Sequence, residues 1–540
     1  MSLSLFQTGK PFPLDQSIVW KILGLATDSG SPEGGPSALI TLRKASQVCS
    51  SWRRLVLTTS SWWGKSIDLD HLRQQTDSWR DVVSQRAGLS LLDISGNCGH
   101  STGALMFLAN ILDRNWHRVR SLSLNRQDAE RSCEAILSVM QRPAPHLEVF
   151  MVPFIFPGSG IYSPPDFPLF SGSFSCLKRF NSFNYPFDSR GPWVSQLREL
   201  YLWDNHYNDP RQLLDLLSHM PFLEAFEIRG TNEIIAENSS ANPLPKAALP
   251  MLVRMFLDTT TSFSSWSRVL ENIMPAKHSG LWIYHHATAA LSQDDIESLC
   301  HLLSLHASRY FGARRTSNLF LYLGDNEFNL RHGSEEDQYD DSDDSSESSG
   351  PGSLTPNNFA FIVECPNSLP GNAVQSLIGA FIQMPLQLTD IKELTLTVAT
   401  ASLSPHEPAF IRLMDTLSSI EMIETDPTTL KFILDAAIGR SAAVLPRLQE
   451  IQLPFADDVS NAPSLIDQFL SWRWERGMPV QLLDLQRPYS RLRGDFSLLE
   501  KYKDLRVFWY DTRGRRVKYI CGSGNAATLD FATSPSWLSG

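Results

Sequence analysis

A leucine pattern that recurs along most of the chain constrains its fold more than any other feature. The motif L-x-x-L-x-L, with other large apolar residues at some leucine positions, recurs through residues 85–325 and again through 355–490. The first seven copies start at 89, 119, 147, 177, 197, 223 and 252, so that most are 26 to 30 residues apart. Helix-like stretches such as Arg211–Met220 lie between the copies. This period predicts an array of strand-plus-helix repeats, which bury their apolar faces only by stacking on one another.

The repeating unit resembles the leucine-rich repeat and predicts an α/β fold in the form of an irregular solenoid, or horseshoe. The array is irregular because the asparagine that normally follows the strand is plain only at Asn97 and Asn205. The unit that contains Leu177 is poorly formed, and residues 400–445 contain no strand that the pattern can place. Plain α/β layers remain the alternative. The alternation at 505–519 around Arg513-Gly514 predicts a C-terminal hairpin.

Residues 10–65 instead have helical periodicity. Ile18, Ile22, Leu25 and Ala26 follow the spacing of one helix face. A glycine- and proline-rich loop, 28–37, separates them from a second amphipathic helix. Its apolar positions are Leu39, Leu42, Ala45, Cys49, Trp52 and Val56.

Three short motifs in this helical segment resemble the F-box of fungal F-box proteins with leucine-rich repeats. An opening, Leu14-Asp15-Gln16-Ser17-Ile18-Val19-Trp20-Lys21-Ile22-Leu23, precedes Val48-Cys49 with Trp52-Arg53, and then Trp62-Trp63. Asp15 and Ser17 stand where the family has proline and glutamate. Asp15 can still cap the helix in place of the proline. With Ser17 in place of the family's glutamate, however, the surface expected to meet the partner lacks that acidic side chain.

The resemblance implies that the segment docks on the Skp-type linker of a cullin-based (SCF) ubiquitin ligase. A unit of this size cannot bury all of its large apolar side chains, so some of them must meet a partner or the following repeats. The alternative is that the helices only cap the repeats. The linker-binding residues that we expect are Leu14, Ile18, Ile22, Leu23, Leu42, Val48, Cys49, Trp52, Leu55, Trp62 and Trp63.

The repeats would bind a target protein through side chains that alternate outward from their strands. Four consecutive copies carry aromatic rings beside charges at these positions, which is typical of protein-binding hot spots. The predicted target-binding residues are Tyr201, Trp203, Glu227, Arg229, Phe256, Asp258, Trp282 and Tyr284.

The charge pattern argues against nucleic acid as the partner. The net charge is −11, but eight acidic residues lie in one insertion at 331–356, which leaves −3 for the rest of the chain. The remainder thus has no broad basic face. The insertion lacks hydrophobic periodicity, so we expect it to be a disordered loop. It interrupts the repeats of 85–330, which continue through 357–540.

We expect a cytoplasmic or nuclear protein. No apolar run is long enough to span a membrane, and the first residues lack the pattern of a signal peptide. The seven cysteines are scattered without a CxxC pair, as expected of reduced thiols.

Three local patterns resemble catalytic or ligand-binding motifs. Gly99–Gly103 matches the nucleophile elbow G-x-S-x-G around Ser101, but a helix cap at Ser101 or Thr102 explains it better. His285-His286 lacks a third metal ligand, and the glycines after Cys521 lack the lysine of a phosphate-binding loop.

The sequence therefore predicts a non-enzymatic ubiquitin-ligase adaptor without a metal or another cofactor. Its expected domains are an F-box at 10–70 and repeats at 85–330 and 357–540, with the acidic insertion at 331–356. A leucine-rich-repeat scaffold outside any ligase is the alternative, and an esterase built on Ser101 is a more distant one. The sequence does not identify the target protein.

Overall fold

A computed structural model shows a mixed α/β protein in which short strands and helices alternate along the chain. It describes residues 16–25, 27, 37–124, 133–152, 169–172, 176–181, 191–203, 209–230, 243–260, 263–276, 279–332, 358–366, 368–383, 388–399, 403–454, 461–488, 494–511 and 513–531. The described strands form no closed barrel. The chain divides into two compact units, one of residues 1–206, 215–223 and 345–350 and one of residues 207–214, 224–344 and 351–540.

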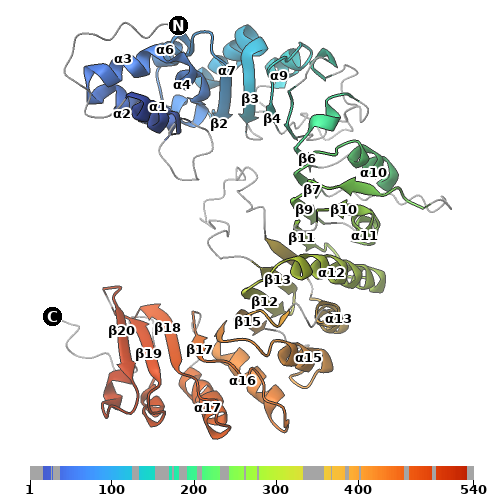
Figure 1. The fold of residues 1–540 in the computed structure, drawn as a ribbon, viewed down its shortest axis with the longest axis vertical. Coiled ribbons are helices and arrows are strands. Elements are labelled where there is room, and N and C mark those ends of the chain that lie inside the picture. The colour runs from blue at the N-terminus through green and yellow to red at the C-terminus, as the bar shows by residue number, and fades with distance from the viewer. Residues whose placement is uncertain are drawn as a thin grey trace. The chain divides into compact units, whose positions relative to one another are not determined.

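The N-terminal unit begins with four helices (Figure 1): α1 (Gln16–Leu25), α2 (Ala38–Val48), α3 (Ser50–Thr58) and α4 (Ser60–Lys65). The long amphipathic run of the sequence is thus two helices, not the single one expected. They separate at Cys49, whose backbone is extended, with φ −158° and ψ 169°. The Cys49 sulfur accepts a hydrogen bond from the Trp52 backbone N at 3.5 Å and caps α3. The Val-Cys-x-x-Trp motif therefore forms a helix–helix junction.

The rest of this unit is a series of short strands that pair in chain order. Each neighbouring pair from β1 to β6 is parallel. Its elements are β1 (Ile67–Asp68), α5 (Leu69–Leu72), α6 (Asp77–Ala87), β2 (Leu92–Gly96), α7 (Thr102–Asn115), β3 (Val119–Leu124), α9 (Cys133–Met140), β4 (Val149–Met151), β5 (Arg179–Asn181) and β6 (Glu199–Trp203), with 3-10 turns at Trp116–Arg118, Leu169–Gly172 and Val194–Gln196.

The second unit has a longer ladder of strands in the order β7-β9-β11-β14-β13-β12-β15-β16-β17-β18-β19-β20. All pairs are parallel except those that β13 makes on both sides and the terminal pair β19–β20. The strands are β7 (Ala225–Gly230), β9 (Arg254–Thr259), β11 (Gly280–His286), β12 (Asn318–Gly324), β13 (Glu327–His332), β14 (Phe359–Glu364), β15 (Glu393–Ala399), β16 (Met422–Thr425), β17 (Glu450–Gln452), β18 (Leu482–Pro488), β19 (Arg506–Tyr510) and β20 (Arg516–Ile520).

The helices of the second unit lie along one side of these strands (Figure 1). They are α11 (Phe263–Glu271), α12 (Gln293–Ala313), α13 (Gly371–Phe381), α15 (Pro408–Thr416), α16 (Pro427–Ala437) and α17 (Ala462–Glu475), and helix α10 (Pro210–Ser218) spans the boundary between the two units. Two short strands, β8 (Ala247–Leu249) and β10 (Ile273–Pro275), form a separate parallel pair. Two 3-10 turns, Ser497–Lys501 and Ala526–Leu529, complete the C-terminal end.

Alternation within the strands explains where the core lies. In β12, Leu319, Leu321 and Leu323 are buried, while the residues between them, Phe320 and Tyr322, belong to the opposite face. Side chains of successive strands point to opposite faces, so the leucines form the core with the helices.

Hydrogen bonds from side chain to backbone join one strand–helix unit to the next. The Asp295 carboxylate accepts from the backbone N of Phe263 and of Ser264, which lie 32 and 31 residues earlier. Thr425 Oγ1 donates to the Leu396 carbonyl 29 residues earlier. These spacings agree with the period of the leucine pattern.

Several details differ from the expectation. Leu89, the first residue of the first copy, is 95% exposed and precedes β2, which begins at Leu92. Strand β16 lies in the stretch where no strand could be placed. Strands β13 and β14 separate β11 from β12, so that neighbouring copies are not always neighbouring strands. Strands β19 and β20 form the hairpin that the alternation predicts.

The acidic insertion follows β13 and precedes β14, and residues 333–357 lie outside the described ones. Among the described residues, no helix is both long and apolar enough to cross a bilayer.

Candidate functional site

Helix α1 has apolar side chains on two faces, and only one of them is buried. Val19 and Leu23 are 0% and 3% exposed. Ile18, Ile22 and Leu25, spaced i, i+4, i+7, are 46%, 48% and 73% exposed. We call these three residues the α1 apolar face. Large aliphatic side chains grouped on one helix face lose favourable burial energy in water and mark an interaction surface.

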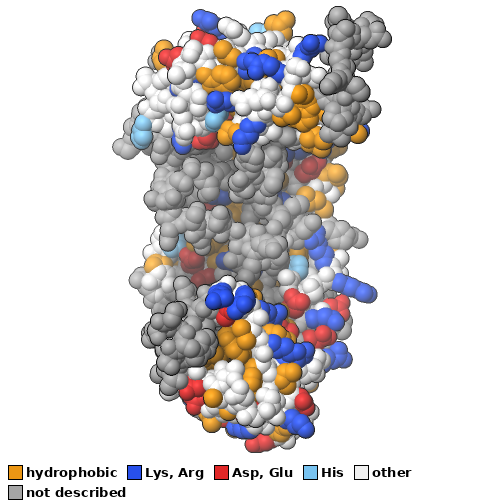
Figure 2. Space-filling model, turned by 90° about the vertical axis from the view of Figure 1, so that its left-hand side faces the viewer, with side chains coloured by type: hydrophobic (Ala, Val, Ile, Leu, Met, Phe, Trp, Pro, Cys, Tyr) orange, Lys and Arg blue, Asp and Glu red, His pale blue; other side chains and the backbone are white. Residues whose placement is uncertain are grey.

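Two further exposed apolar residues of this helical segment are Trp20 and Val48. Val48 ends α2 and is 64% exposed. Trp20 is 45% exposed, and its ring centroid lies 4.6 Å from that of Trp62. On the side that Figure 2 presents, hydrophobic side chains gather among Lys and Arg on the N-terminal unit, at the top of the view. Sequence reasoning did not include Trp20 or Leu25 in the site, although the spacing of Leu25 indicated it.

The two adjacent tryptophans of α4 have an internal role. Trp63 is fully buried, and its indole Nε1 donates to the Val56 carbonyl at 2.8 Å. The Arg86 guanidinium stacks 4.5 Å from the Trp63 ring centroid, and the Trp79 ring meets it edge-on at 6.4 Å. Trp63 thereby fastens α4 to α6. Trp62 is 3% exposed.

The predicted linker-binding residues thus divide into two groups. Five of them are buried in this structure, so they hold the helices together and offer no surface to a partner: Leu23, Leu42, Leu55, Trp62 and Trp63. Ile18, Ile22, Val48 and Cys49 are exposed, and Trp52 is half-buried. Leu14 lies outside the described residues.

The predicted target-binding residues of the second unit lie in register on one sheet face. Phe256 is paired with Glu227 on one side and with Trp282 on the other. Asp258 is paired in the same way with Arg229 and Tyr284. The residues between them, among them Leu257 and Ile283, are buried in the core, but Glu227 and Phe256 are also buried, each 4% exposed. The structure therefore brings six of the eight predicted side chains together.

The other two predicted residues are not part of this group. Tyr201 belongs to the N-terminal unit, where its hydroxyl donates to Glu199 at 2.8 Å and its ring is 5% exposed. Trp203 lies on the same strand, but its side chain is outside the described part of the structure.

Contacts on this face connect rings with charges. The Arg229 Nε donates to Glu227 at 2.7 Å, and its guanidinium lies 4.9 Å from the Phe256 ring centroid. The Phe256 and Trp282 centroids are 6.3 Å apart. Arg331 of β13 lies 6.0 Å from the Trp282 centroid. Such cation–π and ring contacts hold flat side chains in place.

The same face includes polar residues that sequence reasoning missed. The Tyr284 hydroxyl donates to Glu364 Oε2 at 2.6 Å, and His286 Nδ1 is 3.1 Å from the same oxygen. The pKa of Tyr284 is raised, mainly by burial and secondly by the hydrogen bond to Glu364. Glu327 of β13 is paired with Glu364 of β14. Glu327 and Glu364 were missed because no local pattern places β13 and β14 between β11 and β12.

The motifs that resemble catalytic ones have structural roles. Ser101 caps α7 and accepts from the Ala104 backbone N at 3.3 Å. His285 is 2% exposed and packs against the Phe263 ring, and burial lowers its pKa to about 4. Among the described residues, no group of three or more His, Cys, Asp or Glu side chains is arranged to hold a metal ion.

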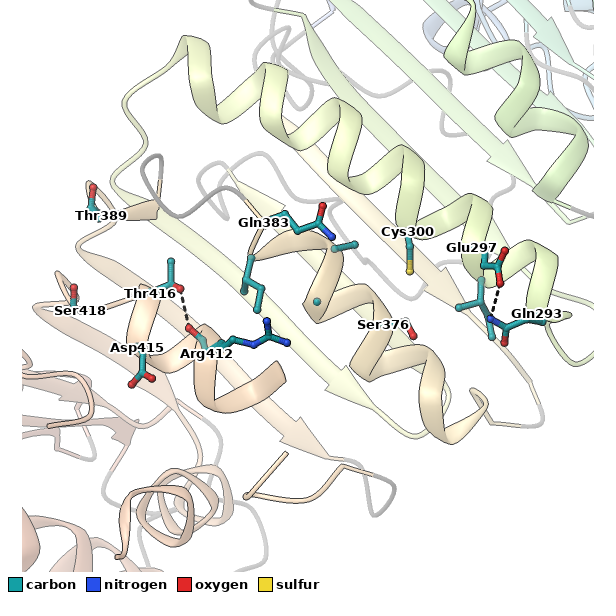
Figure 3. A pocket seen from close by; sticks show the side chains of 14 residues that line it. Gln293, Glu297, Cys300, Ser376, Gln383, Thr389, Arg412, Asp415, Thr416 and Ser418 are labelled. Atoms are coloured by element: carbon teal, nitrogen blue, oxygen red, sulfur yellow. Dashed lines mark hydrogen bonds between the residues drawn. The ribbon is translucent and has the colours of Figure 1, made fainter. Parts of the chain in front are cut away.

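A groove lies on the helical side of the second unit. It has a volume of about 870 Å³ and lies among α12, α13 and α15 (Figure 3). Its polar groups already have partners: Gln293 donates to Glu297 at 3.0 Å and accepts from Asn372 of α13 at 3.3 Å. The Thr416 hydroxyl donates to the Arg412 carbonyl at 2.7 Å, and the Asp415 carboxylate accepts from Arg440 at 2.8 Å. Burial raises the pKa of the Cys300 thiol to about 11, so this thiol is a poor nucleophile at neutral pH. The groove has no arrangement typical of catalysis.

The chain matches no known protein-family model and no curated protein sequence.

Proposed function

We propose that this chain is a substrate-recruiting adaptor of an SCF-type ubiquitin ligase. The observation that carries the proposal is the α1 apolar face, which is exposed within the segment that has F-box-like motifs. Burying a fully exposed large side chain gains roughly 1.5–3 kcal/mol, so Ile18 and Ile22, which are about half exposed, would each gain roughly half of that, and a few such residues support an interface. In this proposal they dock on the Skp-type linker, together with Val48 and Trp52.

The ladder of strands would act as a leucine-rich-repeat solenoid that holds the target. Register and side-chain bonds between units about one period apart support this interpretation. The adaptor would act by proximity, because it raises the effective concentration of target lysines near the ubiquitin-conjugating enzyme. No bond is made or broken by the adaptor itself.

A leucine-rich-repeat scaffold outside any ligase is the second candidate. Two observations favour it: Ser17 replaces the acid of the F-box opening, and Trp62 and Trp63 are committed to the core. Both candidates use the same sheet face for the partner protein and differ only in whether α1 binds a linker.

Co-purification with a Skp-type linker and its cullin tests the proposal. The wild-type chain should retain both proteins on an affinity column, while Ile18→Asp should retain less than a tenth as much. Met106→Asp is the matched control, because Met106 is a 58% exposed apolar residue on another helix of the same unit. If the wild type retained neither protein, or if Ile18→Asp behaved as Met106→Asp does, the adaptor proposal would be wrong.

A further inference from the structure

A group of acidic and aromatic side chains lies on the sheet face of the second unit where β9, β11, β14, β13 and β12 are neighbours. We call Asp258, Glu327, Glu364, Trp282, Tyr284 and Tyr322 the acidic-aromatic face. Asp258 is paired with Tyr284 across β9 and β11, and Glu364 is paired with Glu327 across β14 and β13. Glu364 and Glu327 come from neighbouring strands, whereas β11 lies between the strands of Asp258 and Glu364, which are therefore about 10 Å apart.

The negative charge on this surface is only partly compensated. Glu364 accepts from Tyr284 and contacts His286, and Glu327 accepts from Asn329 Nδ2 at 2.8 Å. No hydrogen bond to the Asp258 carboxylate is found among the described residues. Burial raises the pKa of Asp258, against the lowering effect of the Arg229 and His286 charges. Burial likewise raises the pKa of Glu327, against the hydrogen bond from Asn329, and the Glu364 charge acts in the raising direction at both groups.

The nearest arginines already have other contacts. Arg229 is bound to Glu227 and stacks on Phe256. The Arg331 Nε donates to Asn329 Oδ1 at 2.8 Å, and its guanidinium lies 5.6 Å from the Phe320 ring centroid. A further cation from outside the chain would therefore find carboxylates beside it without displacing these contacts.

Aromatic rings border the carboxylates. Trp282, Tyr284 and Tyr322 are half-buried, which leaves part of each ring accessible. The Tyr322 ring lies over Gly324, where an added Cβ would come within 2.7 Å of it. A lysine or arginine side chain can lay its methylene stem along such rings and keep its charge at the carboxylates. A nucleic acid or an acidic peptide would be repelled.

We propose that the acidic-aromatic face binds a lysine or arginine side chain of the target protein. This inference rests on the proposal that the second unit binds a target protein. It adds that the bound part of the target carries a positive charge. The cation would sit between Asp258 and Glu364, with Trp282 and Tyr284 beside its stem. The carboxylates and rings are spread over several strands, so the ligand that we propose is a side chain of a protein segment and not a free small cation.

The test uses an equimolar library of random 12-residue peptides passed over the immobilised full-length chain, with bound peptides identified by mass spectrometry. Lys or Arg should be enriched at least fivefold over its frequency in the library. In the double variant D258N/E364Q the enrichment should fall below twofold. The amide that replaces the Glu364 carboxylate retains an oxygen that accepts from Tyr284, so this variant removes charge with little change in contacts. Trp282→Ala should also lower the enrichment.

Glu450→Gln is the matched control, because Glu450 is a carboxylate of the same sheet face on β17, bound to Gln452 at 2.7 Å. This variant should leave the enrichment as in the wild type. The inference is overturned if the wild type shows no enrichment, or if the enrichment persists in D258N/E364Q. Melting curves that coincide with the wild type establish that each variant is folded.

Linker retention, measured on the same variants, separates this inference from the adaptor proposal. D258N/E364Q should retain the linker as the wild type does, because Asp258 and Glu364 belong to the second unit and the α1 apolar face to the first. Linker retention without peptide enrichment overturns the acidic-aromatic face alone. Enrichment without linker retention overturns the adaptor and leaves a protein-binding scaffold.

Discussion

Ile18 and Val19 are consecutive in α1, yet one is 46% exposed and the other fully buried. The sequence shows apolar residues around much of this helix, so periodicity identified an apolar face but not which face packs inward. The difference depends on contacts with residues distant in sequence, which local spacing does not include.

Substitution at these two positions should therefore have opposite effects on folding and binding. Val19→Asp buries an unpaired charge and should lower the stability of the N-terminal helices by at least about 3 kcal/mol. Ile18→Asp leaves the new charge in water and should cost less than about 1 kcal/mol. Hydrogen exchange of the α1–α4 peptides measures both, and equal protection in the two variants would contradict the burial of Val19.

Buried histidines make the second unit sensitive to acid. Burial lowers the pKa of His306 to about 3. Burial is also the main reason why the pKa values of His285 and His332 fall to about 4. Each stays neutral in the fold and takes up a proton on unfolding. Stability is therefore full above the ordinary value of 6.5 and falls below it, by about 1.4 kcal/mol per pH unit for each histidine.

His306→Leu tests this dependence, because His306 is 4% exposed and its Nε2 has no hydrogen-bond partner among the described residues. Between pH 7 and pH 5 the variant should lose about 2 kcal/mol less stability than the wild type. Urea unfolding at the two pH values measures the difference. Parallel losses in both proteins would show that His306 is not kept neutral by the fold.

At the scale of elements, helix α12 illustrates how one side chain links neighbouring units. Asp295 is 9% exposed and forms a capping box with Ser292, whose hydroxyl is 2.7 Å away. The same carboxylate caps α11 through the backbone N of Phe263 at 3.0 Å. Two helix starts therefore depend on one buried acid.

Asp295→Ala should destabilise the second unit by about 3 kcal/mol, because it leaves one buried and one half-buried backbone donor without their acceptor. Asp294→Ala is the control, since Asp294 is an exposed residue in the same helical turn and should change stability by less than about 0.5 kcal/mol. Urea unfolding monitored by circular dichroism compares them. Equal losses would contradict the shared cap.

Much of the strand register could be predicted from the leucine pattern alone. The buried rows of β7, β9 and β11 follow it, and so do the six outward residues that the structure brings together. The strands β12, β13 and β14 could not be placed. Leu319, Leu321 and Leu323 alternate as a strand should, but the pairing of β14 with β11 spans a gap of about 78 residues that no local pattern indicates.

The same limit applies to the candidate site. Rings and charges at Phe256, Asp258, Trp282 and Tyr284 were visible in the sequence because they occupy the x positions of L-x-L. Glu327 and Glu364 were not, because their partners are strands whose order is set by long-range pairing. The structural roles of Trp62 and Trp63 could not be predicted from the sequence either, because α6, which packs against Trp63, lies outside the motif.

At the scale of the whole molecule, we propose one task for each unit. The N-terminal helices would join the ligase through the α1 apolar face, and the second unit would hold a target with a basic side chain. Because the two surfaces belong to separate units, a variant in one should leave the binding of the other unchanged.

The affinity of the purified chain for a purified Skp-type linker, measured by calorimetry, tests the central claim most directly. We expect a one-to-one complex for the wild type and for Met106→Asp, and an affinity at least tenfold weaker for Ile18→Asp. A wild-type chain that gives no binding heat, or an Ile18→Asp variant that binds as tightly as the wild type, would contradict it.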